Sequence, residues 1–180
     1  MKVLLENHKT APEQLELEIT ESVIMVDPAR ALEILKRISS MGVALSIDDF
    51  GTGYSSLSYL KKLPVNAVKI DKSFVINMTT DQNDAQIVRS TIDLAHNLGL
   101  KVIAEGVETL EVWDRLTALG CDEAQGYYMS RPLPASGLTQ WMFDSPWGFR
   151  NRANRIVNSN GDLLFENGTF PTPTVRETSR

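Results

Sequence analysis

The chain has 180 residues, of which 42 % are hydrophobic and 23 % are charged. These values are typical of a soluble globular domain and exclude a collagen-like, low-complexity or wholly disordered chain. The formal charge of −5 argues against duplex nucleic acid as a partner, because that partner requires a basic stripe. A single cysteine, Cys121, fits a reducing compartment. No apolar run approaches the roughly 18 residues of a membrane span, so we expect a cytoplasmic protein.

Strand and helix signals alternate along the first two thirds of the chain. Runs with alternating or β-rich side chains predict strands at 15–20, 43–47, 67–70, 101–105 and around 123–127. Capping residues, helical spacing and glycine stops predict helices from Asp27-Pro28 to Gly42, at 55–62, at 84–98 and at 109–119. Two glycines predict a loop at 48–53. The apolar residues expected to face inward include Ile34, Ile87, Leu110, Trp113 and Leu116.

This alternation implies parallel strands joined by helical crossovers. An open doubly wound sheet and a (β/α) barrel both satisfy it. The composition changes after Pro134, so we divide the chain into a domain at 1–134 and a tail at 135–180. The tail holds one apolar cluster that suits a helix, and the apolar pairs around 156–157 and 163–165 predict a small hairpin with an Asn-Gly turn.

Four of the predicted strands carry an ionisable residue at or near the carboxyl end: Glu18, Asp48, Lys69 and Glu105. In both candidate folds, this end of the strands is where ligands bind. Any one of these residues alone is more simply a surface charge, but four together favour a site. Converging carboxylates repel one another unless cations lie between them, and ligands that are all oxygens favour hard cations such as Mg²⁺, Mn²⁺ or Ca²⁺. The adjacent Asp48 and Asp49 suit two neighbouring ions, an arrangement used for displacement at phosphorus, and a nearby lysine can neutralise a phosphoryl oxygen.

The chain also resembles a known family, segment by segment and in the family's order. The matching segments are LELEITES (15–22), SIDDFGTGYSSLSYL (46–60), VKIDKSF (68–74), VIAEGVET (102–109) and AQGYYMSRPLP (124–134). Together they are similar to the motifs of EAL-domain cyclic-di-GMP phosphodiesterases. The resemblance implies a modified TIM-type (β/α)₈ barrel that hydrolyses cyclic di-GMP to 5′-pGpG with Mg²⁺ or Mn²⁺, inhibited by Ca²⁺.

The same resemblance implies roles for individual residues. Glu18, Asp48, Asp49 and Glu105 match metal ligands, with Glu105 matching also a general base. Lys69 matches the active-site lysine near the attacking water. The residues matched to the surroundings of the site are Gln125 in the water and metal shell, Glu21 steadying the loop at 50–56, and Glu108 in a loop near the ligand.

The sequence departs from the family at its beginning. It contains no Glu-Ala-Leu-x-Arg motif, and the family's asparagine ligand has no counterpart, since Asn7 lies too close to 15–20. We therefore expect an incomplete barrel of about five of the eight βα units, with weak or no turnover by the chain alone. A homodimer or a complementing N-terminal segment could supply the rest. The alternative is a degenerate module that binds cyclic di-GMP or a partner protein without catalysis.

Overall fold

The computed structural model describes residues 1–53, 57–147, 156–157 and 163–164. The chain forms two compact units, Met1–Gly126 and Tyr127–Arg180, and each is described here by itself. In the described part of the chain, no helix is both long enough and apolar enough to cross a membrane.

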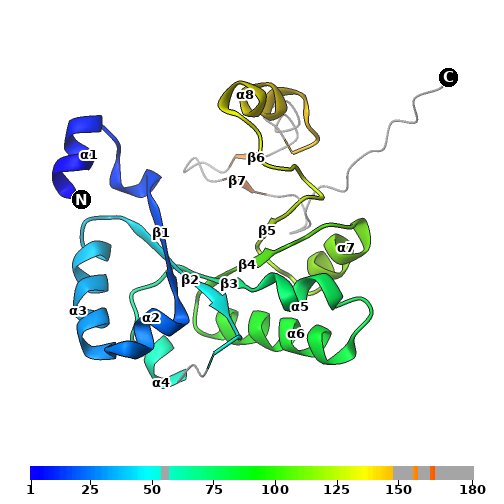
Figure 1. Ribbon diagram of the computed structural model, residues 1–180, viewed down its shortest axis with the longest axis horizontal. Helices are drawn as coiled ribbons and strands as arrows, with labels where there is room; N and C mark the ends of the chain where they lie inside the picture. The colour runs from blue at the N-terminus through cyan, green and yellow to red at the C-terminus, as the bar shows by residue number, and fades with distance from the viewer. Residues whose placement is uncertain (54–56, 148–155, 158–162, 165–180) are drawn as a thin grey trace. The chain divides into compact units, whose positions relative to one another are not determined.

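The first unit is built on a five-stranded sheet with the order β1-β2-β3-β4-β5 (Figure 1). The strands are β1 (Glu16–Thr20), β2 (Ala44–Phe50), β3 (Ala67–Ile70), β4 (Lys101–Glu105) and β5 (Glu123–Gln125). Every neighbouring pair is parallel and consecutive in the chain. A consecutive order has no point at which the strand order reverses, so it fits a segment of a barrel rather than a doubly wound sheet.

Helices lie between these strands, as the alternation in the sequence predicts, and the first helix precedes β1. They are α1 (Lys2–His8), α2 (Glu21–Val26), α3 (Pro28–Ser39), α4 (Leu57–Leu60), α5 (Lys72–Asn77), α6 (Gln82–Asn97) and α7 (Leu110–Ala118), with a 3₁₀ turn, η1 (Pro12–Gln14). The predicted start of α3 is confirmed, because the Asp27 carboxylate accepts a hydrogen bond from the Arg30 amide at 3.1 Å. The sequence prediction missed α1, α2 and α5, since helices of six or seven residues are too short to show a helical period.

The hydrophobic core lies between the sheet and the helices. On the strands, every second residue faces the helices and is buried: Leu45, Ile47, Val68, Ile70, Val102 and Ala104. Helix α6 contacts both β3 and β4, and it contributes buried Val88 and Ile92. Helix α7 contributes Trp113 and Leu116, as predicted. Apart from Ile103, the opposite face of the sheet carries small, polar and charged residues.

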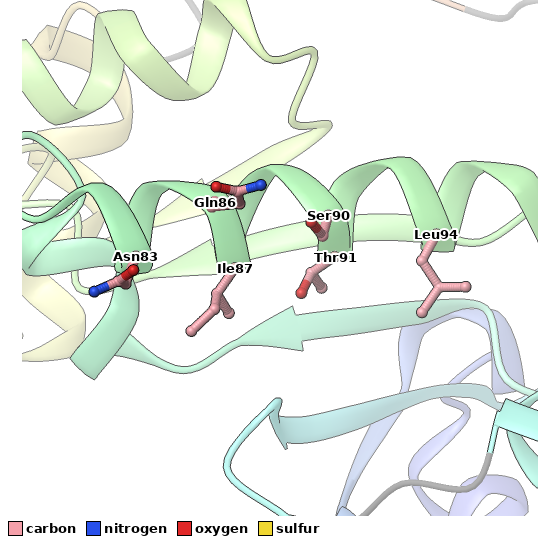
Figure 2. A pocket seen from close by; sticks show the side chains of 6 residues that line it. All are labelled: Asn83, Gln86, Ile87, Ser90, Thr91 and Leu94. Carbon is pink, nitrogen blue, oxygen red and sulfur yellow. The ribbon is translucent and has the colours of Figure 1, made fainter.

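Three residues predicted to face inward are instead exposed. Ile34 is 44 % exposed, Ile87 37 % and Leu110 46 %. Figure 2 shows that Ile87 lines an open hollow along α6, together with Asn83, Gln86, Ser90, Thr91 and Leu94. The predicted inward face of α6 is wrong at two residues, because it included Ile87, which is exposed, and omitted Ile92, which is buried. Leu110 is the first residue of α7, and the helix buries Val112, Trp113 and Leu116 instead.

Side chains also fasten the starts of the strands to one another. The side-chain carbonyl oxygen of Asn66 accepts a hydrogen bond from the Leu45 amide at 2.9 Å. The Asp122 carboxylate does the same for the Val102 amide at 2.8 Å, and the same oxygen lies 2.9 Å from His96 Nε2. In each case the residue just before one strand holds the start of the preceding strand. These hydrogen bonds therefore tie together the amino ends of neighbouring strands.

The second unit contains α8 (Ala135–Asp144), where the sequence suggested a helix. Trp141 and Trp147 are stacked with ring centroids 6.5 Å apart, and the Trp141 indole N–H donates to the Met129 carbonyl at 3.3 Å. Strands β6 (Ile156–Val157) and β7 (Leu163–Leu164) pair in antiparallel fashion. The predicted Asn-Gly turn between them, Phe165, and the stretch from Pro171 that we expected to be disordered lie outside the described residues.

Candidate active site

Four ionisable residues meet at the carboxyl ends of four neighbouring strands. The Lys69 ammonium lies 2.6 Å from Glu18 Oε1, 2.6 Å from Glu105 Oε1 and 3.4 Å from Asp48 Oδ1. The lysine comes from β3, and the three carboxylates come from β1, β4 and β2. The structure thus brings together the set that the sequence placed at the strand ends, on the sheet face turned away from the helices.

Lys69 is the buried member of this cluster, with only 3 % of its surface exposed. Burial alone would lower the pKa of the ammonium, but the contacts with Glu105 and Glu18, together with the charges of Glu105 and Asp48, raise that pKa on balance. Lys69 therefore stays protonated throughout the neutral range. The buried ammonium remains charged because its carboxylate partners stabilise the charge.

A bulge in β2 separates the two adjacent aspartates. The register with β3 shifts between Ile47 and Phe50, and Asp49 adopts a left-handed backbone conformation with φ of 55°. Because an extra residue in a strand re-aims the side chains beside it, Asp48 faces Lys69, while Asp49 lies near Asp71. The predicted loop at 48–53 is wrong in its start, since β2 continues through Phe50.

Asp49 and Asp71 form a second acidic pair next to the cluster. Burial and the charges of Asp48 and Asp71 raise the pKa of Asp49. Burial would also raise the pKa of Asp71, but hydrogen bonds from the Ser73 hydroxyl and amide, with the charge of Lys72, lower it on balance. The sequence prediction missed Asp71. The signal was present, because Asp71 stands two residues after Lys69 and so leaves the strand on the same side.

Glu21 and Gly53 are close neighbours at the edge of the rim. Glu21 is only 5 % exposed, and neither of its carboxylate oxygens has a hydrogen-bond partner among the described residues. A side chain at position 53 would place its Cβ 2.7 Å from Glu21 Oε1. Glu21 therefore touches the beginning of the turn after β2, the loop that the resemblance assigned to it, although residues 54–56 lie outside the described part of the chain.

Gln125 and Glu108 lie at the end of the sheet nearest β5. Gln125 pairs with Glu105 in the β4–β5 register, and its backbone carbonyl accepts a hydrogen bond from the Val107 amide at 3.1 Å. Glu108 is exposed in the turn between β4 and α7, and it makes no ion pair within the described residues. The structure therefore places Gln125 next to a member of the cluster and leaves Glu108 outside it.

The carboxylates are arranged around the ammonium rather than around a common point of their own. Across residues 1–53, 57–147 and the two short strands of the tail, no group of three or more histidine, cysteine or acidic side chains is gathered as a metal cage. The available donors are all oxygens, the kind that Mg²⁺, Mn²⁺ and Ca²⁺ prefer. His96 is engaged with Asp122 at the opposite end of the strands, and Cys121 is buried.

Comparison with known proteins identifies the family to which this arrangement belongs. The model of the EAL domain matches residues 1–132. The chain belongs to the EAL domain family. This confirms the family that the sequence motifs predicted, and it confirms the α/β fold with parallel strands of the TIM-barrel type.

Two relatives with this domain are named as cyclic di-GMP phosphodiesterases. The chain is 50 % identical over 131 residues to the bifunctional diguanylate cyclase/cyclic di-GMP phosphodiesterase MucR of Pseudomonas aeruginosa, covering 73 % of this chain and 19 % of MucR. It is 46 % identical to the cyclic di-GMP phosphodiesterase NbdA of the same organism, covering 71 % of this chain and 16 % of NbdA. The EAL chain thus spans less than a fifth of the length of these relatives.

Solved structures give the same assignment. The PaMucR phosphodiesterase in complex with c-di-GMP superposes with a TM-score of 0.74 at 48 % identity, over 76 % of this chain and 56 % of that one. The manganese/cy-diGMP complex of Klebsiella pneumoniae BlrP1 superposes with a TM-score of 0.66 at 36 % identity, over 71 % of this chain and 33 % of that one. The EAL chain therefore corresponds to only about half of the solved PaMucR chain.

Proposed function

We propose that this chain takes part in the hydrolysis of cyclic di-GMP to linear 5′-pGpG, as part of a bacterial second-messenger phosphodiesterase. The observation that carries the proposal is the convergence of Glu18, Asp48 and Glu105 on the Lys69 ammonium, each from a different parallel strand. Carboxylates and a lysine at this rim match the needs of phosphodiester cleavage, which requires cation binding and neutralisation of phosphoryl oxygens.

The proposed cofactor is Mg²⁺ or Mn²⁺, bound by Glu18, Asp48, Asp49 and Glu105. The donor chemistry fits, since all four are carboxylates and these metals favour oxygen ligands. Asp48 Oδ1 is buried and makes no hydrogen bond among the described residues, and its contact with the Lys69 ammonium is the longest of the three ion pairs, at 3.4 Å, so this oxygen keeps capacity to bind a cation. Asp48 and Asp49, turned apart by the bulge, suit two neighbouring metal positions. When bound, such metals supply Lewis-acid stabilisation of charge on phosphorus oxygens and activation of water.

The chain's own residues would then carry the remaining tasks. Lys69 neutralises negative charge that develops on a phosphoryl oxygen as the attacking water approaches in line. Glu105 accepts the proton of that water while the new P–O bond forms and the bond to the 3′ oxygen breaks, and the departing 3′ oxygen takes up a proton from solvent. Gln125, beside Glu105 in the register, helps to position the water. Glu21 holds the turn after β2, and Glu108 contributes from the turn after β4.

Hydrolysis by the purified chain in MnCl₂ tests the proposal directly. Conversion of cyclic di-GMP to 5′-pGpG is followed by chromatography; we expect it to be weak for the chain alone, and any conversion should be lost in Glu105→Ala. Glu123→Ala is the matched control, because Glu123 is a glutamate on the adjacent strand that pairs with Lys101 away from the cluster. Turnover that survives in Glu105→Ala contradicts the proposed site.

The alternative function, a binding module without catalysis, gives a different result in the same experiment. No turnover, combined with saturable binding of cyclic di-GMP or of a partner protein, would support it. We propose that a second copy of the chain or a complementing N-terminal segment provides the remaining βα units. Size-exclusion chromatography beside the assay tests the first of these, and a well-behaved monomer with full turnover contradicts both.

A further inference from the structure

Lys69 joins carboxylates that lie on strands which do not touch. Glu18 is on β1 and Glu105 is on β4, and β2 and β3 separate them in the sheet. Both glutamates nevertheless approach the same ammonium at 2.6 Å. Among the described residues, Lys69 is the only cation that makes an ion pair with Glu18, Asp48 or Glu105. The lysine is therefore what holds the two glutamates toward each other across the rim.

The charges of the cluster do not cancel. Three carboxylates and one ammonium leave a formal charge of −2. One divalent cation would bring this sum to zero. Without Lys69, the three carboxylates would carry −3 and would repel each other across a partly buried space, since charges a few Å apart interact strongly where water is scarce. The ammonium and a metal ion thus serve the same carboxylates.

We propose that Lys69 is the resident counter-ion of the metal site: it keeps Glu18 and Glu105 in place in the metal-free protein, and it weakens the binding of the divalent cation that follows. The inference rests on the proposed function, because it takes these carboxylates as the metal ligands. It assigns to the lysine a role that precedes catalysis. Lys69 therefore raises the free energy of unfolding of the metal-free protein and lowers the affinity of the protein for the divalent cation.

Two opposing effects decide the sign of the change in metal affinity. Ordering of the glutamates by Lys69 favours metal binding, but it involves only two side chains and changes affinity by roughly a few-fold. Repulsion between the ammonium and a divalent cation that share the same carboxylates acts over about 4 Å and changes affinity by well over tenfold, even at the dielectric response of a protein surface. Removal of the ammonium should therefore tighten metal binding.

The test compares Lys69→Met with a matched control, Lys101→Met. Lys101, like Lys69, is a strand lysine that pairs with a glutamate: its ammonium lies 3.1 Å from Glu123, but both side chains are more than half exposed. Thermal unfolding is measured in EDTA and in MnCl₂, and Mn²⁺ binding is measured by calorimetry. We expect Lys69→Met to unfold at a lower temperature in EDTA, to gain more from Mn²⁺ than wild type, and to bind Mn²⁺ at least about tenfold more tightly. Lys101→Met should match wild type in both measurements.

Each outcome decides the inference. A Mn²⁺ affinity of Lys69→Met equal to or weaker than that of wild type overturns it, while the metal site and the proposed function stand. If Lys69→Met is unfolded in EDTA, folding on addition of Mn²⁺ supports the inference, and failure to fold in Mn²⁺ overturns it. Lys69→Arg keeps the charge and should retain the wild-type Mn²⁺ affinity; an affinity like that of Lys69→Met argues against a charge effect. Absence of any Mn²⁺ binding in both wild type and Lys69→Met removes the metal site and, with it, the proposed function.

Discussion

Gly126 follows β5 at a place where a larger residue has no room. A Cβ added to Gly126 would lie closer than 3.0 Å to the carbonyl oxygen, the amide nitrogen and the carbonyl carbon of Val107. Val107 is fully buried, so its backbone cannot move into solvent to relieve the contact. The demand is steric, because Gly126 is absent from the residues with positive φ. We therefore predict that Gly126→Ala strongly destabilises the first unit.

The magnitude follows from the two interactions that would be disturbed. Overpacking against a fixed core costs about 1–3 kcal/mol and sometimes more. The Val107 amide also donates to the Gln125 carbonyl at 3.1 Å, and loss of a buried hydrogen bond leaves an unpaired group at a cost of about 1–3 kcal/mol. We therefore expect Gly126→Ala to lower the free energy of unfolding by about 3 kcal/mol or more.

Urea unfolding followed by circular dichroism measures this loss. Gly120→Ala is the control, since nothing lies within 4 Å of its added Cβ and only the φ of +77° opposes the substitution. That backbone strain costs about 1–2 kcal/mol. A loss of stability in Gly126→Ala no greater than that in Gly120→Ala would refute the steric explanation.

Three further predictions concern the ends of the strands and helices. Asp122→Ala should lower the free energy of unfolding by about 1–3 kcal/mol in urea titrations, because it leaves the Val102 amide unpaired. Asp122→Asn keeps an acceptor and should lose less stability. Equal losses in the two variants would contradict the role of the acceptor. Asp27→Ala removes the cap of α3 and should lower the free energy of unfolding by about 1 kcal/mol, measured as a lower melting temperature. An unchanged melting temperature would contradict the capping role. Burial raises the pKa of the Cys121 thiol from 9.0 to about 12. The free energy of unfolding should therefore be unaffected by this thiol below pH 9 and should fall as the pH rises from 9 toward 12. Iodoacetamide at about pH 9 should label Cys121 only after urea is added. Rapid labelling of the folded chain would contradict the burial of Cys121.

The sequence was informative wherever a pattern repeated over several residues. Alternation in 15–20 and the β-rich runs located all five strands of the sheet, since side-chain direction in a strand follows from position alone. The same rule placed Glu18, Asp48, Lys69 and Glu105 at one rim, where the structure finds them in contact. Asp71 obeys this rule as well and was missed only because the predicted strand stopped one residue earlier.

Other features depend on tertiary structure and leave no local signal. The bulge at Asp48–Asp49 follows from the fit of β2 against β3, and no residue in the sequence specifies φ of 55° at an aspartate. Glu21 has the sequence context of a surface residue in a short helix, yet it is buried against Gly53. The inward faces of α3 and α6 could not be bounded to within one residue, because the width of a helix's apolar stripe depends on what packs beside it.

The bulge in β2 has a consequence for amide hydrogen exchange. Before it, the pairs Ser46–Ala67 and Ile47–Val68 continue the ladder with β3, whereas the register is interrupted before Phe50 meets Ile70. Amides in an uninterrupted ladder exchange only through larger openings, while those at an interruption exchange through local ones. Protection should therefore drop abruptly along a single strand, from slow exchange at Ile47 to fast exchange at Asp49. Asp49 would then sit on backbone that opens locally, while Asp48 stays in register with Thr20 of β1.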